Sequence, residues 1–259
     1  MNSIIVITNK EKPLARKYAG KILNWTKKIK YSGPKFAVIL GGDGMMLKAA
    51  RELAGKGIPL LGVNLGEVGF LAETNVKNIF RALKKILTGK YGIEERSMLQ
   101  VEVYREKKLL NKFIALNDAV IKNGESARVI NLRLSIEGKF INRVVADGIL
   151  ISTPTGSTAY CLASGGPIVH PQSKVLIAVP VSPHSLTQRP LVFPDDETIG
   201  IEVGPNRIKT ILSIDGQIHM RLKTDDIVRI SISDLKTKLI VTGENDYFDV
   251  LKEKFKWGA

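Results

Sequence analysis

The hydrophobic pattern of this 259-residue chain changes its period once, near Thr88-Gly89-Lys90. Before that point, short apolar runs of strand type alternate with segments whose apolar residues recur every three or four positions, as in helices. After it, strict alternation dominates: Leu99, Val101 and Val103 are separated by polar residues. The sequence therefore predicts an α/β domain followed by an all-β domain.

The first 90 residues contain three expected strands that alternate with three expected helices. The strands are expected at 4–8, 36–40 and 58–64, and the helices at 12–28, 45–53 and 76–87. This order is typical of a Rossmann-like parallel sheet, in which ligands bind at the carboxyl ends of the strands.

The second domain is expected to span residues 91–242. Glu137-Gly138 predicts a hairpin turn within it. The expected strands lie at 99–104, 130–136, 139–145, 148–152, 174–181, 198–203, 208–214, 217–222, 226–232 and 237–241.

The end of the chain returns to a helical period, with Phe248, Leu251 and Phe255 on one face of a helix expected at 246–256. A lone helix that follows a β domain must bury its apolar face. We expect it to dock on the N-terminal domain, which would then comprise residues 1–90 and 243–259.

The expected strand at 36–40 leads into Gly41-Gly42-Asp43-Gly44. Glycines allow a bulky anion to approach the backbone, and the N-terminus of the following helix attracts negative charge. A carboxylate repels phosphate, so Asp43 is better suited to take a proton or position a metal ion. The structural alternative, in which Asp43 only caps the helix, is about as probable on these four residues alone.

Three further stretches combine tight turns with polar side chains. Asn64–Leu71 follows the next strand; Phe70 within it is more plausibly a packing residue than a base-stacking one. Asn117-Asp118 suits a ribose or an adenine edge, although an Asx turn explains the bare pair equally simply. Asp147–Tyr160 is the densest polar stretch, and half of its fourteen residues carry a hydroxyl or a carboxylate.

Composition restricts the class of protein. One cysteine and three histidines without metal-type spacing argue against a disulfide framework and a zinc site. The longest apolar runs are too short to cross a bilayer, and the N-terminus leads straight into a strand, so we expect a cytoplasmic protein without a membrane partner. The net charge of +14 fits either nucleic acid or a site for several phosphates.

The chain resembles the NAD kinase (ATP-NAD kinase) family, within the superfamily of diacylglycerol kinases and phosphofructokinases. The Gly-Gly-Asp-Gly turn is common to that superfamily, whereas Ser-Thr-Pro-Thr-Gly-Ser-Thr-Ala-Tyr is specific to NAD kinases. Stretches that match the family in order and spacing span nearly the whole chain: Gly41–Gly44, Asn64–Leu71, Asn117-Asp118, Asp147–Tyr160, Ser185–Pro190, Asp215–Gln217 and Leu251–Gly258. Asp118 stands where the family commonly has Glu, and Cys161 where it often has Asn.

This resemblance implies roles for individual residues. Asp43 is implied to be the catalytic base for the 2′-hydroxyl of the adenosine ribose of NAD. The turn residues Gly41, Gly42 and Gly44 are implied to bind phosphate or ATP. The residues implied to bind NAD are Gly44, Phe70, Asn117, Asp118, Asp147, Thr155, Thr158, Ala159 and Tyr160.

The implied reaction is phosphorylation of NAD to NADP with ATP and Mg²⁺ or another divalent ion, in a homotetramer that binds no nucleic acid. The sequence does not identify the metal ligands, and it leaves inorganic polyphosphate open as the donor. Two alternatives are a lipid or sphingoid-base kinase, for which no long apolar stretch is evident, and a non-catalytic dinucleotide- or nucleic-acid-binding protein. A charge excess alone favours neither alternative, because it carries no information about the fold or the site.

Overall fold

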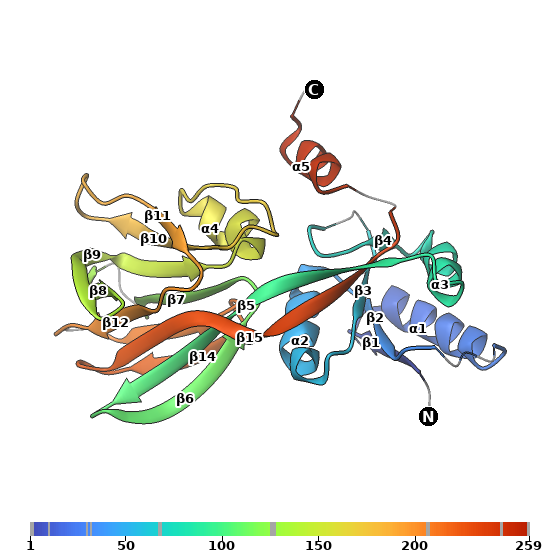
Figure 1. The fold of residues 1–259 in the computed structure, drawn as a ribbon, viewed down its shortest axis with the longest axis horizontal. Helices are drawn as coiled ribbons and strands as arrows, with labels where there is room; N and C mark the ends of the chain where they lie inside the picture. The colour runs from blue at the N-terminus through green and yellow to red at the C-terminus, as the bar shows by residue number, and fades with distance from the viewer. Residues whose placement is uncertain are drawn as a thin grey trace. The chain divides into compact units, whose positions relative to one another are not determined.

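The chain folds into two compact units (Figure 1). Unit 1 comprises residues 1–95 and 236–259, and unit 2 comprises residues 96–235. The chain leaves unit 1 within β5 (Gly92–Arg105) and returns within β15 (Ile227–Val241). The expected domain limits at 90/91 and 242/243 remain a prediction. A computed structural model describes residues 3–9, 11–29, 31, 33–66, 69–124, 128–205, 208–243 and 246–257.

Unit 1 contains the expected parallel sheet with helices on both faces. Its elements are β1 (Ile4–Thr8), α1 (Pro13–Thr26), β2 (Phe36–Leu40), α2 (Asp43–Leu53), η1 (Ala54–Lys56), β3 (Leu60–Asn64), β4 (Thr74–Asn75), α3 (Ile79–Leu87) and α5 (Tyr247–Phe255). Strands β1, β2 and β3 run parallel, with Ile5 opposite Ala37 and Val38 opposite Leu61. Since all five residues of β2 are buried, this strand is covered on both faces, as a parallel strand between helices should be.

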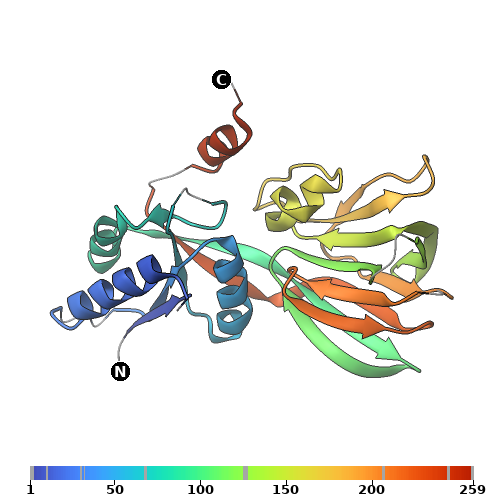
Figure 2. The ribbon, with the colours of Figure 1, turned by 180° about the vertical axis from the view of Figure 1, so that it is seen from behind.

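The two faces of this sheet carry different helices. Ala15, Ala19 and Ile22 of α1 share one apolar cluster with buried residues of α3 and with alternate residues of β2. Helix α2 lies on the opposite face, where the Met46 sulfur would be 3.1 Å from a Cβ added at Gly62 of β3. Figures 1 and 2 show α1 and α2 on opposite sides of β1 and β2.

Unit 2 is built from antiparallel strands around β9. Its elements are β6 (Lys108–Ala115), β7 (Asp118–Asn123), β8 (Ile130–Ile136), β9 (Lys139–Ser152), η2 (Thr155–Thr158), α4 (Tyr160–Ala163), β10 (Val175–Pro183), β11 (Leu191–Pro194), β12 (Ile199–Val203), β13 (Thr210–Ile214) and β14 (Ile218–Leu222), with most of β5 and β15. Strand β9 pairs with β7, β8 and β10. Inward-facing residues of these strands form one large apolar cluster, and Cys161 of α4 belongs to a smaller cluster with Leu150 and Ile177.

Several expected elements differ from the observed ones. Strands 139–145 and 148–152 are one strand, because the backbone ladder continues through Asp147 and Gly148, where the apolar alternation breaks. Strands 226–232 and 237–241 are likewise one strand, β15. The helix expected at 76–87 begins only at Ile79, and the helix expected from Met45 begins at Asp43. The short strands β4 and β11 and the strands β6 and β7 were not among the strands expected from the sequence.

The C-terminal helix α5 belongs to unit 1, but only part of its expected apolar face is buried there, because Phe248 is 56% exposed. The Asp246 side chain caps it by accepting a hydrogen bond from the backbone N–H of Phe248 at 2.8 Å. Leu251 is buried, and the ring centroid of Phe255 lies 6.1 Å from that of Phe70. Among the described residues, no helix is long and apolar enough to cross a membrane.

Candidate active site

The Gly-Gly-Asp-Gly turn joins the end of β2 to the start of α2 in unit 1. The Gly41 backbone N–H donates to the Val63 carbonyl oxygen at 3.0 Å, which ties the turn to the end of the neighbouring strand. Gly42 occupies the N-cap position of α2, and Asp43 is the first residue of the helix. Asp43 therefore does not act as the N-cap of its own helix, in contrast to the structural alternative considered from the sequence.

The Asp43 carboxylate instead holds the loop that follows β3. Its two oxygens accept hydrogen bonds from the backbone N–H groups of Phe70 and Leu71, each at 3.3 Å. A Cβ added at Gly69 would lie 2.4 Å from the Asp43 Oδ1, so a larger residue there would have to displace the carboxylate. The carboxylate is half-buried and fixed in orientation by the chain, which suits a group that must accept a proton at a defined position.

Phe70 packs against an aromatic pair from the end of the chain. Its ring meets that of Phe255 at an interplanar angle of 38°, and the Phe255 ring lies 5.5 Å from that of Trp257. Phe70 is half-buried, so packing accounts for part of the ring. Glu67 and Val68, in the same expected loop, lie outside the described residues.

The second polar group lies in unit 2, where β7 begins. We call Leu116, Asn117 and Asp118 with Asp215 the acidic corner. The Asp215 carboxylate accepts hydrogen bonds from three consecutive backbone N–H groups, those of Leu116 at 3.1 Å, Asn117 at 2.8 Å and Asp118 at 3.2 Å. Asp215 occupies the tight turn between β13 and β14 with φ 49°, followed by Gly216 with φ 66°. This turn brings its carboxylate back to the start of β7, and the sequence did not indicate that contact.

Asp118 is the more unusual carboxyl of the acidic corner. It is only 5% exposed, and burial raises its pKa to about 7, with a further contribution from the Asp215 charge. A carboxyl with such a pKa carries a proton for part of the time at neutral pH and can either donate or accept a hydrogen bond. Perturbed carboxyls of this kind concentrate at functional sites.

The stretch after β9 closes around the same corner. The Thr153 hydroxyl donates to the Leu116 carbonyl oxygen at 2.6 Å, and the Thr153 backbone N–H donates to the Asn117 carbonyl oxygen at 2.9 Å. A Cβ added at Gly156 would lie 2.3 Å from the Asn117 carbonyl oxygen, so the two segments touch through glycine.

Two buried side-chain atoms at this corner have no hydrogen-bond partner in the described part of the chain. They are the Oδ1 of Asn117 and the Oγ1 of Thr155. Leaving a buried polar atom unpaired costs about 1–3 kcal/mol, so such atoms are expected where a ligand or a water supplies the partner. Asn117, Asp118 and Thr155 thus form a preformed polar site.

The remaining expected residues continue from Thr155. Thr158 ends η2, Ala159 follows it, and Tyr160 begins α4 with an exposed side chain. Cys161 is buried, and burial raises the pKa of its thiol to about 11. A thiol with that pKa is protonated at neutral pH, so Cys161 is a packing residue.

Asp147 lies apart from the acidic corner. Strand β7 pairs with β9 so that Asp118 lies opposite Ser152, whereas Lys122 lies opposite Gly148. Asp147 is therefore five residues from Ser152 along β9, roughly 17 Å away. There its Oδ1 accepts a hydrogen bond from the Asn123 side-chain amide at 3.2 Å.

The described residues contain no cluster of three or more His, Cys, Asp or Glu side chains able to hold a metal ion. Mg²⁺ in phosphoryl-transfer sites is commonly held by one or two carboxylates together with the phosphates of the substrate. The half-buried carboxylate of Asp43 fits that arrangement. It could not by itself form a site in which protein side chains alone hold the ion.

Both halves of the chain match known family profiles. The profile of the ATP-NAD kinase N-terminal domain matches residues 4–91, and that of the ATP-NAD kinase C-terminal domain matches residues 116–242. The NAD kinase of Geobacter metallireducens is 43% identical over 222 residues, which cover 86% of this chain and 78% of that protein. The NAD kinase of Moorella thermoacetica is 37% identical over 100% of this chain and 91% of that protein.

Two solved structures share the fold. Yeast NADH kinase complexed with NADH has a TM-score of 0.88 at 23% identity, covering 99% of this chain and 88% of that chain. The NAD kinase from Archaeoglobus fulgidus in complex with ATP has a TM-score of 0.77 at 22% identity, covering 98% of both chains. Profiles over both halves and relatives at this level of identity over most of the sequence lead to one conclusion: the chain belongs to the ATP-NAD kinase family.

Proposed function

We propose that this chain transfers the γ-phosphate of ATP to the 2′-hydroxyl of the adenosine ribose of NAD, producing NADP, with Asp43 as the general base. The observation that carries the role of Asp43 is its carboxylate, fixed by two backbone N–H groups at the start of α2. A secondary hydroxyl is a poor nucleophile, so the reaction depends on positioning, proton removal and neutralisation of charge on the transferred phosphate.

The turn around Asp43 would bind the phosphates. Of the proposed phosphate-binding residues Gly41, Gly42 and Gly44, the last two are at least partly exposed, whereas Gly41 is buried and donates its N–H to Val63. The positive end of the α2 dipole favours negative charge beside them. A divalent ion such as Mg²⁺, carried by the ATP phosphates and bound on the protein side by Asp43, would neutralise charge on the transferred group. Phe70 would line the same part of the site.

The acidic corner would bind the dinucleotide. The unpaired Oδ1 of Asn117 and Oγ1 of Thr155 would meet polar groups of NAD, and Asp118 would bind a ribose hydroxyl that does not react. Asp147, Thr158, Ala159 and Tyr160 complete the proposed set of NAD-binding residues. Asp147 is the least supported of them, because it lies five residues from Ser152 along β9 and accepts a hydrogen bond from Asn123 there.

We further propose that the protein is a homotetramer. Unit 2 exposes large apolar residues on its strands, among them Phe140 (52% exposed), Val192 (50%) and Ile141 (42%). Apolar side chains on exposed strands are commonly covered by another copy of the chain. Light scattering should give a mass of four chains, and a monomer at micromolar concentration would contradict this proposal. The expected cytoplasmic location remains a prediction.

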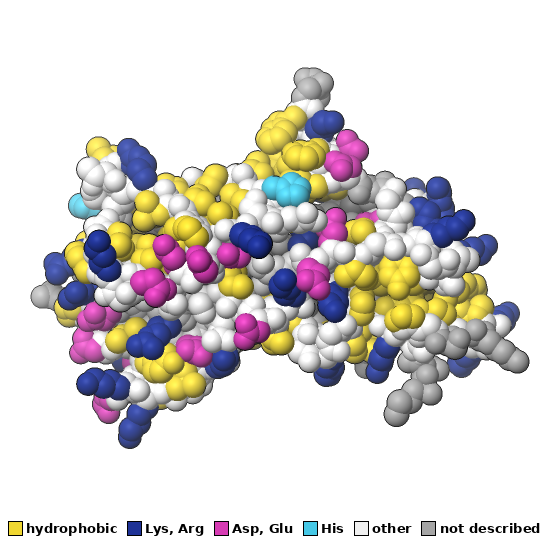
Figure 3. All heavy atoms as spheres, viewed as in Figure 1, with side chains coloured by type: hydrophobic (Ala, Val, Ile, Leu, Met, Phe, Trp, Pro, Cys, Tyr) yellow, Lys and Arg dark blue, Asp and Glu magenta, His cyan; other side chains and the backbone are white. Residues whose placement is uncertain are grey.

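No observation favours the nucleic-acid-binding alternative. Figure 3 shows the Lys and Arg side chains spread over this face of the molecule, whereas nucleic-acid-binding proteins usually gather them into a patch or stripe. The lipid-kinase alternative would need a long apolar pocket beside Asp43. The cavity of unit 1 around Lys56, Tyr91 and Lys238 does not include Asp43, so it does not supply one.

The test is an activity screen that crosses NAD and NADH with ATP and inorganic polyphosphate in the presence of Mg²⁺. NAD with ATP should give a product whose new phosphate is located on the 2′-oxygen by ³¹P NMR. Heat-denatured protein is the control for contaminating phosphate transfer. The proposal fails if no acceptor and donor pair gives NADP or NADPH while circular dichroism shows folded protein.

A further inference from the structure

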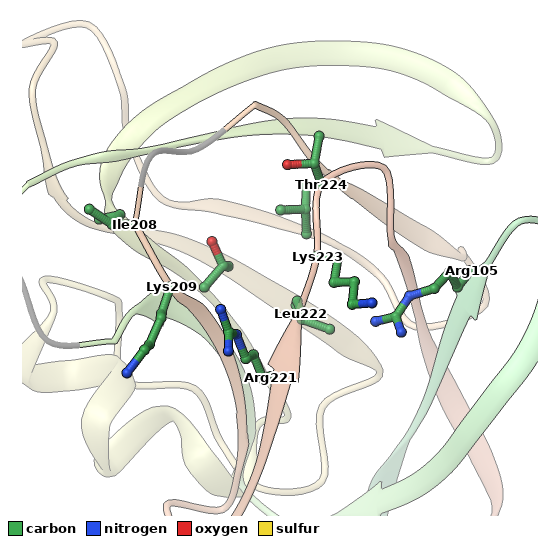
Figure 4. Close-up of a pocket in the computed structure, with 9 residues that line it drawn as sticks. Arg105, Ile208, Lys209, Arg221, Leu222, Lys223 and Thr224 are labelled. Atoms are coloured by element: carbon green, nitrogen blue, oxygen red, sulfur yellow. The ribbon is translucent and has the colours of Figure 1, made fainter.

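Unit 2 has a cavity of about 480 Å³ that none of the functions above uses (Figure 4). It is lined by residues of β5, of the start of β13, of the end of β14 and of the loop after β14. Four of its lining side chains are cationic, Arg105, Lys209, Arg221 and Lys223, and none of its lining side chains is acidic. Such a concentration of one charge in a cavity attracts small anions.

Three of these cations lie at one end of the β13–β14 pair. Lys209 and Lys223 lie directly beyond the last pair of these strands, Thr210 with Leu222, and Arg221 is the last residue but one of β14. Figure 4 shows the Lys223 side chain directed toward Arg105, with Arg221 between Lys209 and Lys223. Neighbouring like charges repel one another, and a bound anion would reduce that cost.

The fourth cation is held in place by a buried carboxylate. Asp226 has no exposed side-chain surface and accepts hydrogen bonds from Arg105 Nε at 2.7 Å and Nη2 at 2.8 Å. It also accepts one from the backbone N–H of Lys223 at 2.8 Å, which fixes the loop after β14. The Arg105 Nη1 has no partner among the described residues, so its N–H groups remain available to a ligand. A guanidinium that is held in one orientation by a carboxylate, as Arg105 is by Asp226, is well suited to bind an anion through its remaining N–H groups.

The rest of the lining limits the kind of ligand. Val203, Ile208 and Leu222 supply apolar surface, and Thr210 and Thr224 supply hydroxyl groups. No aromatic side chain lines the cavity, so a nucleobase would find no ring to stack on. The volume is in the range of small-molecule sites, about 300–1,000 Å³.

We propose that this cavity binds a small ligand with at least two anionic groups, of the phosphate or carboxylate type, at a site separate from the acidic corner. The two sites are at opposite ends of one strand. Thr210 begins β13, whereas Asp215 follows its last residue, Ile214, so the strand separates them by roughly 17 Å.

Lysine footprinting on the full-length protein tests the proposal independently of kinase activity. Lysines are acetylated in about 150 mM salt, where long-range surface attraction is screened, with increasing tripolyphosphate, citrate or orthophosphate. Mass spectrometry then reports the acetylation of Lys223, with the exposed Lys139 of β9 as an internal control. Tripolyphosphate or citrate should protect Lys223 in a saturable manner, and which of them binds more tightly tells phosphate from carboxylate ligands. Orthophosphate should bind more weakly than both.

A matched pair of variants separates a site from general charge attraction. Arg221→Gln should raise the midpoint concentration for protection of Lys223 about tenfold or more, the loss expected for one charge-assisted contact. Arg16→Gln removes the same charge from the exposed surface of α1 and should leave the midpoint unchanged. The proposal would be overturned if both variants shifted the midpoint equally, or if neither tripolyphosphate nor citrate protected Lys223. It would also be overturned if a random oligonucleotide, added as a further probe, were the only compound to protect Lys223.

Discussion

Replacing Asp118 by Asn should stabilise the unliganded protein at neutral and alkaline pH. The folded state holds the pKa of Asp118 at about 7, compared with an ordinary value of 3.8. Between these values the folded state binds the proton more tightly than the unfolded state does. The contribution of this group to stability is therefore fully present below about pH 4 and is lost as the pH rises through about 7. Asparagine does not titrate, so the variant escapes this loss.

The size of the effect follows from the shift. A rise of about three pKa units corresponds to about 4 kcal/mol in total, of which about 2–3 kcal/mol is lost between pH 5 and pH 8. Urea unfolding followed by circular dichroism at pH 5, 6, 7 and 8, at one protein concentration without ligand, measures this. The difference in the free energy of unfolding between Asp118→Asn and the parent should increase by about 2–3 kcal/mol in favour of the variant from pH 5 to pH 8.

The control is Asp234→Asn, which removes an exposed carboxylate of β15 in the same unit. It removes a carboxylate without changing a buried group, and its effect on the free energy of unfolding should be small. A difference between Asp118→Asn and the parent that stays flat from pH 5 to pH 8 would refute the reasoning. In kinetics, Asp118→Asn should raise the KM for NAD more than it lowers kcat, because the proposed partner of Asp118 is a hydroxyl that does not react.

Three further predictions concern packing around the two polar groups. Gly156→Ala should lower the free energy of unfolding by about 1–3 kcal/mol and raise the KM for NAD, because the added Cβ would lie 2.3 Å from the Asn117 carbonyl oxygen; a melting curve equal to the parent's would contradict this. Gly69→Ala should reduce kcat and leave the melting temperature nearly unchanged, because the added Cβ displaces the end of the Asp43 side chain; unchanged kcat would count against the proposed position of Asp43. Cys161 should resist labelling by a thiol reagent until the protein is unfolded, and rapid labelling of the native protein would show that the thiol is not buried.

The sequence predicted the architecture because the period of its apolar residues differs between the two units. The alternation of β2 with α2 and of β3 with α3 is visible as a change between strand-type and helix-type patterns. Strand β6 was missed because Lys108–Ala115 is mostly exposed and carries little alternation. Strands β9 and β15 were each divided in two because polar residues interrupt an apolar pattern while the backbone hydrogen bonds continue.

The candidate site was only partly predictable for a different reason. Asp43 and Asn117-Asp118 stand in local patterns, a Gly-rich turn and a polar pair at a strand end, that sequence can display. The hydrogen bonds of Asp43 to the loop after β3, and those of Asp215 to the start of β7, join residues 27 and 98 positions apart. The Asp-Gly dipeptide at 215–216 indicates a hairpin turn, but its contact with β7 depends on the pairing of β13 with β7, which the sequence does not display.

The most direct test of the central claim is the turnover of Asp43→Asn. Asparagine keeps one oxygen that can accept a hydrogen bond from the loop after β3, and Gly42 rather than residue 43 is the N-cap of α2, so the fold should survive. The variant cannot accept a proton, and kcat for NADP formation should fall roughly 10²- to 10⁴-fold, a rise of about 3–5 kcal/mol in the barrier. Calorimetry should show NAD binding within a few-fold of the parent. A folded variant whose kcat stays within about threefold of the parent would contradict the assignment of Asp43 as the general base.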